Sequence, residues 1–177
     1  MNELVWIDLE TTGLEPKHCC ILEMAMVLTD SDLNVLEEFS RVIKQPKRSA
    51  VGFRSAMPAE VLAMHASSGL LDDVAAATYA VGAVESEMRV LMELTFGPAH
   101  ANIRKRPLIG GSSVHFDRAF IEVHMPQLNK HFHYRHFDVT SISEAARRWY
   151  PDQFRDRRFA LEVAERSPVG AGRDQHI

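Results

Sequence analysis

The sequence predicts a single α/β domain in which a mixed β-sheet is flanked by helices. Its 177 residues, 46% of them hydrophobic, suffice for one core and leave little chain for a second. Three short apolar runs come early, and helical patterns then alternate with further strand-like runs. Such an order of elements is typical of a sheet covered by helices.

The early apolar runs predict a strand meander. They cover residues 4–9, 21–28 and 35–43, and the last of them partly alternates between apolar and polar side chains. Residues 29–32, Thr-Asp-Ser-Asp, are typical of a turn. We therefore expect the second and third strands to be joined by a tight connection.

A long amphipathic helix is expected over residues 77–94. Val81, Val84, Met88 and Leu91 recur there at helical spacing, while charged residues lie off that stripe. The apolar stripe is expected to pack on the rest of the domain.

A further strand and helix are expected after this long helix. Residues 107–111, Pro-Leu-Ile-Gly-Gly, predict a strand that runs into a loop. The helix that follows places Phe116, Phe120 and Val123 on one face.

The last regular elements are expected to be a strand around Phe137 and a helix from Ser141 to Tyr150. Ser141 is the predicted N-cap, and Pro151 is the predicted stop.

The domain core is expected to span residues 1–151. Residues 152–177 lose the earlier periodicity and end in a coil of small residues. We expect this segment to be atypical for the fold and disordered.

Charge and cysteine content limit the classes of function. The net charge of −4 argues against a protein that coats long nucleic acid, because phosphate contacts dominate that affinity. A short nucleotide substrate remains open. Cys19 and Cys20 are adjacent, which suits neither a disulfide nor a metal site and suggests a reducing compartment.

No targeting signal or membrane span is recognised in the sequence. The amino terminus starts directly into an apolar run, without a cationic region before a long hydrophobic segment. We expect a soluble, cytoplasmic protein, and a mitochondrial location is left open.

The residues that carry most chemical information are Asp8 and Glu10. Two acids separated by one residue on a strand point to the same face, while Ile7 and Leu9 point to the other. Carboxylates so placed in an apolar strand repel each other and lose hydration unless a cation lies between them. The competing interpretation is a strand end with exposed acids.

A second acidic segment strengthens the metal hypothesis. Asp117 stands at the start of a predicted helix, after a glycine-rich approach. Alone, Asp117 would be interpreted as an acid favoured by the helix dipole. Hard divalent cations take oxygen ligands from more than one segment, so Asp117 together with Asp8 and Glu10 predicts a metal site.

Further motifs follow in a fixed order along residues 4–151. They are Trp6-Ile7-Asp8-Leu9-Glu10 with Thr12-Gly13-Leu14, His65-Ala66-Ser67-Ser68-Gly69-Leu70, Ser113-Val114-His115-Phe116-Asp117, Met125-Pro126-Gln127-Leu128, His133-Tyr134-Arg135, Asp138-Val139-Thr140-Ser141 and Ala146-Arg147-Arg148-Trp149-Tyr150-Pro151. Together these motifs resemble the oligoribonucleases, a family of the exonuclease superfamily called DEDDh after four acids and a histidine.

The resemblance implies an RNase H-like mixed sheet flanked by helices, with the family's final helix missing or altered here. It implies two divalent cations, Mg²⁺ or Mn²⁺, held by Asp8, Glu10, Asp117 and a fourth acid. Two cations bound in this way stabilise the attacking and leaving oxygens of phosphodiester hydrolysis. The implied activity is 3′→5′ exoribonuclease degradation of short oligoribonucleotides, dinucleotides in particular, to mononucleotides.

The resemblance also implies residues that bind the substrate. Leu14 matches a leucine that wedges between bases. Tyr134 and Arg135 match residues that one subunit of a homodimer contributes to its partner's site, and Tyr134 is also expected to act in catalysis. Asp138 is left as a structural residue. The full set expected to bind substrate is Thr11, Leu14, His65, Ser113, Tyr134, Arg135, Thr140 and Ser141. Without this context, His65 would be interpreted as a surface residue at a helix end, Tyr134 as a half-buried aromatic and Arg135 as a solvated charge.

The family's last motif, a histidine followed after four residues by an aspartate, does not occur after Pro151. Residues 167–174 can be encoded so that a one-base shift reads His-Arg-Ser-Ala-Leu-Asp-Glu, which restores that spacing. We therefore expect a chain that ends in a shifted frame, with impaired activity. The nucleotide sequence tests this expectation, since it fails if no single-base shift restores the motif.

Two other interpretations stay open at this point. One is a catalytically inactive remnant that still binds nucleotides or dimerises. The other is a DNA proofreading-type exonuclease, which shares the superfamily's acids but is disfavoured by the motifs from His133 to Pro151.

Overall fold

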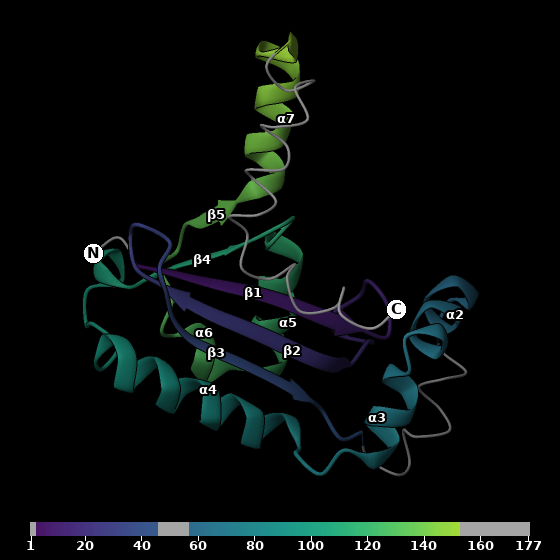
Figure 1. Ribbon diagram of the computed structural model, residues 1–177. Coiled ribbons are helices and arrows are strands. Elements are labelled where there is room, and N and C mark those ends of the chain that lie inside the picture. The colour runs from purple at the N-terminus through teal and green to yellow at the C-terminus, as the bar shows by residue number, and fades with distance from the viewer. Residues whose placement is uncertain (1–2, 46–56, 153–177) are drawn as a thin grey trace.

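The computed structural model describes residues 3–45 and 57–152, and its centre is a five-stranded sheet (Figure 1). The strand order is β3-β2-β1-β4-β5. The first three strands are antiparallel neighbours, whereas β4 runs parallel to β1 and β5 parallel to β4. The strands are β1 (Leu4–Thr11), β2 (Ile21–Thr29), β3 (Val35–Val42), β4 (Leu108–Gly111) and β5 (His136–Asp138).

Helices surround this sheet. The α4 helix packs against β2 and β3, and α5 packs against β1. The α2 and α3 helices lie beyond the carboxyl end of β1, and α7 projects away from the sheet (Figure 1). The helices are α2 (Ala59–Ser67), α3 (Leu70–Ala76), α4 (Val81–Phe96), α5 (His115–His124), α6 (Pro126–Asn129) and α7 (Val139–Trp149), with a 3₁₀ turn, η1 (Ile103–Lys105).

The main core lies on one face of the sheet. Alternate β1 residues Val5, Ile7 and Leu9 are buried there, and Val84 and Met88 of α4 pack against the same cluster. Full burial of such a side chain stabilises the fold by about 1.5–3 kcal/mol. Because strand side chains alternate, this burial turns Asp8 and Glu10 to the opposite face.

Two glycines allow β4 to lie close to β1. A Cβ on Gly111 would stand 2.8 Å from the backbone oxygen of Ile7, and one on Gly110 would stand 3.1 Å from the Trp6 ring. Neighbouring strands lie about 4.8 Å apart. The loop after Gly111 therefore leaves the sheet beside the acidic half of β1.

The fold class expected from the sequence is confirmed, since the structure is a mixed sheet flanked by helices. The strand meander and the strands near residues 107–111 and Phe137 are confirmed as well. The long helix begins at Val81 rather than at residue 77, and its buried stripe includes Met92.

Two helix assignments were wrong in detail. Val123 is 45% exposed, because α5 instead buries Phe120 and Ile121 together with the first-turn residue Asp117. Ser141 is not the N-cap of the last helix. That helix begins two residues earlier, where the Asp138 side chain accepts a hydrogen bond from the Thr140 N–H.

Three short helices, α2, α3 and α6, were not expected. These helices have nine, seven and four residues, which is shorter than the window of about 11–18 residues over which helical periodicity is recognised. Residues 153–177 lie outside the described residues, so the expected frame shift and the expected disorder of this segment stay predictions. Within the described residues, no helix combines the length and apolarity that a membrane crossing requires.

We predict that Gly111→Ala lowers the free energy of unfolding by about 1–3 kcal/mol, because the new methyl group would push the β4 backbone away from β1. Urea denaturation followed by circular dichroism measures this loss. Gly82→Ala in α4 is the matched control, since its Cβ meets open space and a helical alanine is favoured over glycine. Equal losses in both variants would contradict the close approach of β4.

Candidate active site

The acidic site begins on the face of β1 that points away from the main core. Asp8 is exposed and Glu10 is half-buried, while Ile7 and Leu9 between and beside them are buried. The predicted alternation along β1 is therefore confirmed. The two carboxylates share one face next to the carboxyl end of the strand.

Asp117 joins this pair from the first turn of α5. Its side chain is 7% exposed, and its Oδ1 accepts a hydrogen bond from the Leu9 N–H at 3.1 Å. Leu9 lies between the two acids of β1, so this bond brings a third carboxyl group to the same stretch of strand. The structure thus unites all three acids that the sequence singled out.

This arrangement changes the pKa of Asp117. Burial, and secondly the nearby charge of Asp8, raise the pKa of Asp117 to about 7 from an ordinary value of 3.8. The hydrogen bond from Leu9 opposes this rise only in part. A buried carboxyl group beside two other acids is a place where added positive charge lowers the free energy.

The donor set therefore suits a hard divalent cation, which prefers carboxylate oxygens. Among the described residues, no three side chains of the metal-binding types yet stand at the spacing of a formed metal site.

His65 lies behind Glu10 rather than at the protein surface. It is 1% exposed, and its Nε2 donates to the backbone oxygen of Thr11 at 2.9 Å. Its Nδ1 stands 3.8 Å from Oε2 of Glu10. Through its bond to Thr11, His65 of α2 thus holds the end of β1 in place and lies beside Glu10, a contact that the sequence did not reveal.

The loop after β1 is closed on itself and presents one apolar side chain. The Thr11 hydroxyl donates to the Gly13 oxygen at 2.8 Å, and the Cys20 N–H donates to the Thr12 hydroxyl at 2.9 Å. Leu14 is 79% exposed. Its exposure beside the acids is consistent with the predicted contact to a base.

A group of hydroxyls stands at the start of α5. Thr140 Oγ1 lies 2.9 Å from Ser112 Oγ and 3.2 Å from Ser113 Oγ, and it also accepts the Ser113 N–H at 3.0 Å. We call Ser112, Ser113 and Thr140 the hydroxyl cluster. Of the expected substrate-binding residues, the structure brings Ser113 and Thr140 together, and Ser141 is exposed on the first turn of α7.

Tyr134 and Arg135 lie on the loop before β5, two strands away from β1. Tyr134 is 47% exposed and stacks on His133 with ring centroids 4.4 Å apart. Buried Arg118 donates to the backbone oxygen of His133 at 2.6 Å and so anchors this loop to α5. The position of Tyr134 and Arg135 is compatible with the prediction that they serve a partner's site.

Comparison with known proteins decides the family. A family model described as "Exonuclease" matches residues 5–159. The oligoribonuclease of Streptomyces griseus is 41% identical over 152 residues, which cover 85% of this chain and 71% of that protein. The chain belongs to the oligoribonuclease family of exonucleases.

Other oligoribonucleases match to a similar degree. That of Mycobacterium avium is 40% identical over 150 residues, covering 85% of this chain and 66% of the relative. The mitochondrial oligoribonuclease of Mus musculus is 39% identical over 154 residues, covering 86% and 61%. The chain spans about two thirds of the length of the first curated relatives that it matches.

Solved structures support the fold. Exonuclease I from Methylocaldum szegediense superposes with a TM-score of 0.57 at 16% identity, over 83% of this chain and 30% of that one. E. coli exonuclease I in complex with an oligonucleotide gives 0.57 at 17% identity, over 85% and 31%. At such low identity, these matches establish the shared exonuclease fold.

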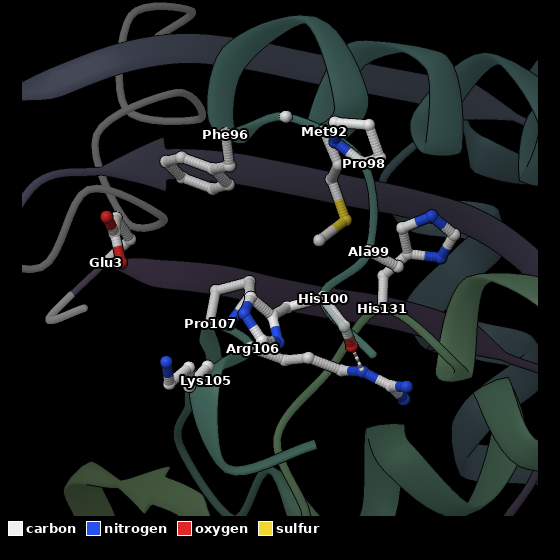
Figure 2. Close-up of a pocket in the computed structure, with 11 residues that line it drawn as sticks. Glu3, Met92, Phe96, Pro98, Ala99, His100, Lys105, Arg106, Pro107 and His131 are labelled. Carbon is white, nitrogen blue, oxygen red and sulfur yellow. Dashed lines mark hydrogen bonds between the residues drawn. The ribbon is translucent and has the colours of Figure 1, made fainter. Parts of the chain in front are cut away.

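A cavity of about 120 Å³ lies away from the acids of this oligoribonuclease-family chain. Its lining includes Glu3 and Pro107, which stand just before β1 and β4, whereas the acids occupy the other half of β1. Figure 2 shows Phe96 and Met92 of α4 above the cavity and Arg106 bonded to the His100 oxygen. The candidate active site is therefore the open acidic face and not this cavity.

Arg118 escaped the sequence interpretation, and Asp138 was considered there only as a structural residue, without its role as a helix cap. Arg118 follows Asp117 directly, and its burial on α5 could have been noticed as a cation among apolar neighbours. Asp138 carried a recognisable signal, because Asp is a preferred N-cap residue just before a helix.

We predict that Asp117→Asn raises the free energy of unfolding of the metal-free chain at pH 8, by an upper limit of roughly 4 kcal/mol. Between about pH 4 and 7 the folded chain binds a proton at Asp117 that the unfolded chain has released, so wild-type stability falls as the pH rises through this window. The variant should lack this fall, and the two proteins should converge near pH 4.

Denaturation curves from pH 4 to 8 measure this effect. Asp32→Asn, at an exposed acid in the β2–β3 turn, is the control. If the free energies of unfolding of wild type and Asp117→Asn differed by the same amount at every pH in this range, the raised pKa of Asp117 would be contradicted.

Proposed function

We propose that the chain is a metal-dependent 3′→5′ exoribonuclease that degrades short oligoribonucleotides, including dinucleotides, to mononucleotides. The observation that carries this proposal is the union of Asp8, Glu10 and Asp117 around the middle of β1, in a chain of the oligoribonuclease family. The names of the relatives support RNA as the substrate.

Asp8, Glu10 and Asp117 would hold two divalent cations, Mg²⁺ or Mn²⁺. When bound, such ions supply charge stabilisation to the attacking and leaving oxygens of an in-line displacement. His65 keeps the Thr11 backbone in position beside Glu10, and the Leu9 N–H keeps one oxygen of Asp117 from rotating.

Substrate contacts would come from the surfaces around the acids. Leu14 offers an exposed apolar side chain for a base, and Thr11 shapes its loop. The hydroxyl cluster, together with Ser141 and Arg135, offers donors to a phosphate. A chain with a net charge of −4 can bind such a substrate because a dinucleotide carries few phosphates to neutralise.

The proposal also includes a homodimer, in which two copies of this chain associate. Tyr134 and Arg135 project from the loop before β5, and we propose that they reach the site of a second copy, where Tyr134 contributes to catalysis. We further propose a cytoplasmic location and a catalytic core over residues 1–151. The mitochondrial relative in Mus musculus keeps a mitochondrial location under consideration.

One observation favours a second candidate function. The printed sequence after Pro151 contains no histidine followed at the family's spacing by an aspartate. A nuclease that works without a general base is slower by about 10² to 10⁴. The alternative is therefore a protein that binds short RNA or dimerises with little turnover.

The test is release of mononucleotides from an end-labelled RNA dinucleotide with Mn²⁺. We expect a slow but measurable release that Asp8→Ala abolishes, because the remaining two carboxylates cannot hold the cations. Glu38→Ala is the control, at an exposed acid on edge strand β3. A DNA dinucleotide should be cleaved more slowly than RNA.

Three results would contradict parts of this proposal. Binding of the RNA dinucleotide without any release at high protein concentration would favour the binding-only alternative. Faster cleavage of the DNA dinucleotide would favour a proofreading-type exonuclease. Equal release by wild type and Asp8→Ala would remove the acidic site from the reaction.

A further inference from the structure

The α5 helix bonds to β1 and to the loop after β1 at two separate points. In its first turn, Asp117 Oδ1 accepts the Leu9 N–H at 3.1 Å. In its last turn, His124 Nε2 donates to the backbone oxygen of Pro16 at 2.9 Å. A carbonyl oxygen can only accept, so this nitrogen of His124 carries a proton. One helix therefore joins the acidic site to the loop that presents Leu14.

The two contacts come from the same face of α5. Asp117 and His124 are separated by close to two helical turns, which is about 10 Å along the helix axis. Phe120 lies on this face between them and is fully buried, and the His124 ring stacks on it with centroids 5.9 Å apart. A rigid, core-bound helix thus sets the distance from Leu9 to Pro16.

The loop itself lacks this fixed relation to α5 without the His124 bond. We call residues 12–20 the Leu14 loop. Bonds within the loop set its shape, as at Cys19, whose N–H donates to the Glu15 oxygen at 2.8 Å. The bond from His124 ties the loop to the helix at Pro16, whose ring already restricts the backbone. Pro16 is two residues from Leu14, so the bond restrains the part of the loop that carries the exposed side chain.

The position of His124 has an ordinary alternative explanation. A histidine in the last turn of a helix is favoured by the helix dipole without any other role. Here the side chain is half-buried, stacks on Phe120 and bonds to a residue 108 positions earlier in the chain. The helix dipole alone does not select such a partner.

We propose that His124 is a positioning residue, which holds the Leu14 loop to α5 and so fixes the separation between Leu14 and the three acids. This inference rests on the proposed function, since it requires a base at Leu14 and a phosphodiester at the acids. A loop that is held before the substrate arrives loses less conformational entropy on binding. His124 therefore contributes to substrate affinity and not to the chemical step.

Two substitutions separate the hydrogen bond from the packing of the ring. His124→Phe keeps an aromatic ring on Phe120 but has no donor. His124→Gln loses the ring but has an N–H group in place of that on Nε2. The positioning role predicts that His124→Phe is impaired and that His124→Gln behaves like wild type.

Hydrogen exchange of the full chain tests the anchoring of the loop. In His124→Phe, a peptide covering residues 12–20 should exchange about three- to tenfold faster than in wild type, because one hydrogen bond is lost from the closed state. In His124→Gln the rate should stay within about twofold of wild type. A peptide covering β1 should be unchanged in both variants.

Release of mononucleotides from an RNA dinucleotide with Mn²⁺ tests the role in binding. In His124→Phe, KM should rise about three- to tenfold while kcat stays within about twofold, because binding of substrate and transition state is weakened equally. His124→Gln should restore the wild-type KM. A merely structural role would instead lower the fraction of folded enzyme, which reduces the apparent kcat and leaves KM unchanged.

A double-mutant cycle with Leu14→Ala tests whether His124 acts through Leu14. In the Leu14→Ala background, His124→Phe should raise KM less than about twofold, because the side chain that the loop positions is gone.

His131→Phe is the matched control. His131 Nδ1 also donates to a backbone oxygen, that of Gln127 at 3.1 Å, but beside the cavity that lies away from the acids. This variant should leave KM and the exchange of residues 12–20 unchanged.

The outcomes separate this inference from the proposed function. Three results would overturn the positioning role and leave the proposed function standing: an unchanged KM in His124→Phe, equal losses in His124→Phe and His124→Gln, or a rise in KM that persists in full in the Leu14→Ala background. If wild type released no mononucleotides, the proposed function would fall and the role of His124 in binding with it.

Discussion

The hydrogen bond between the Leu9 N–H and Asp117 is the constraint on which the site depends. It brings a buried carboxyl group to a strand that already carries Asp8 and Glu10, and it links α5 to the centre of the sheet. The main core supports this bond, since Phe120 and Ile121 of α5 pack with β1 residues in one cluster. Packing energy thus holds together like charges that would otherwise separate, and it leaves a place where a cation is favourable.

Three side chains, each bonded to another segment of the chain, fix the segments around the acids. His65 reaches from α2 to Thr11 and Glu10, Arg118 holds the loop that carries Tyr134, and Asp138 joins the starts of α5 and α7. In each case a buried or capping side chain bonds to backbone groups of another segment. Contacts of this kind fix loop positions that apolar packing alone leaves free.

Much of the sheet could be predicted because its strands carry strong local patterns. The alternation through Ile7 and Leu9 identified both the buried face and the two acids opposite it. Asp117 was found through its place at a helix start. The inward position of His65 could not be predicted, because its partners lie 54 and 55 residues earlier in the chain. The N-cap at Asp138 was misplaced because Ser141 offered a competing capping residue nearby.

The projecting α7 helix gives the molecule an uneven distribution of local stability. None of its residues is buried, and Ile142 and Trp149 are 51% and 74% exposed, although its neighbour β4 is part of the buried sheet. Elements with few buried apolar contacts open at a small fraction of the free energy of global unfolding. In an isolated chain, the amide hydrogens of α7 would exchange with solvent long before those of β1, and an apolar surface laid against α7 would slow this exchange without altering the sheet.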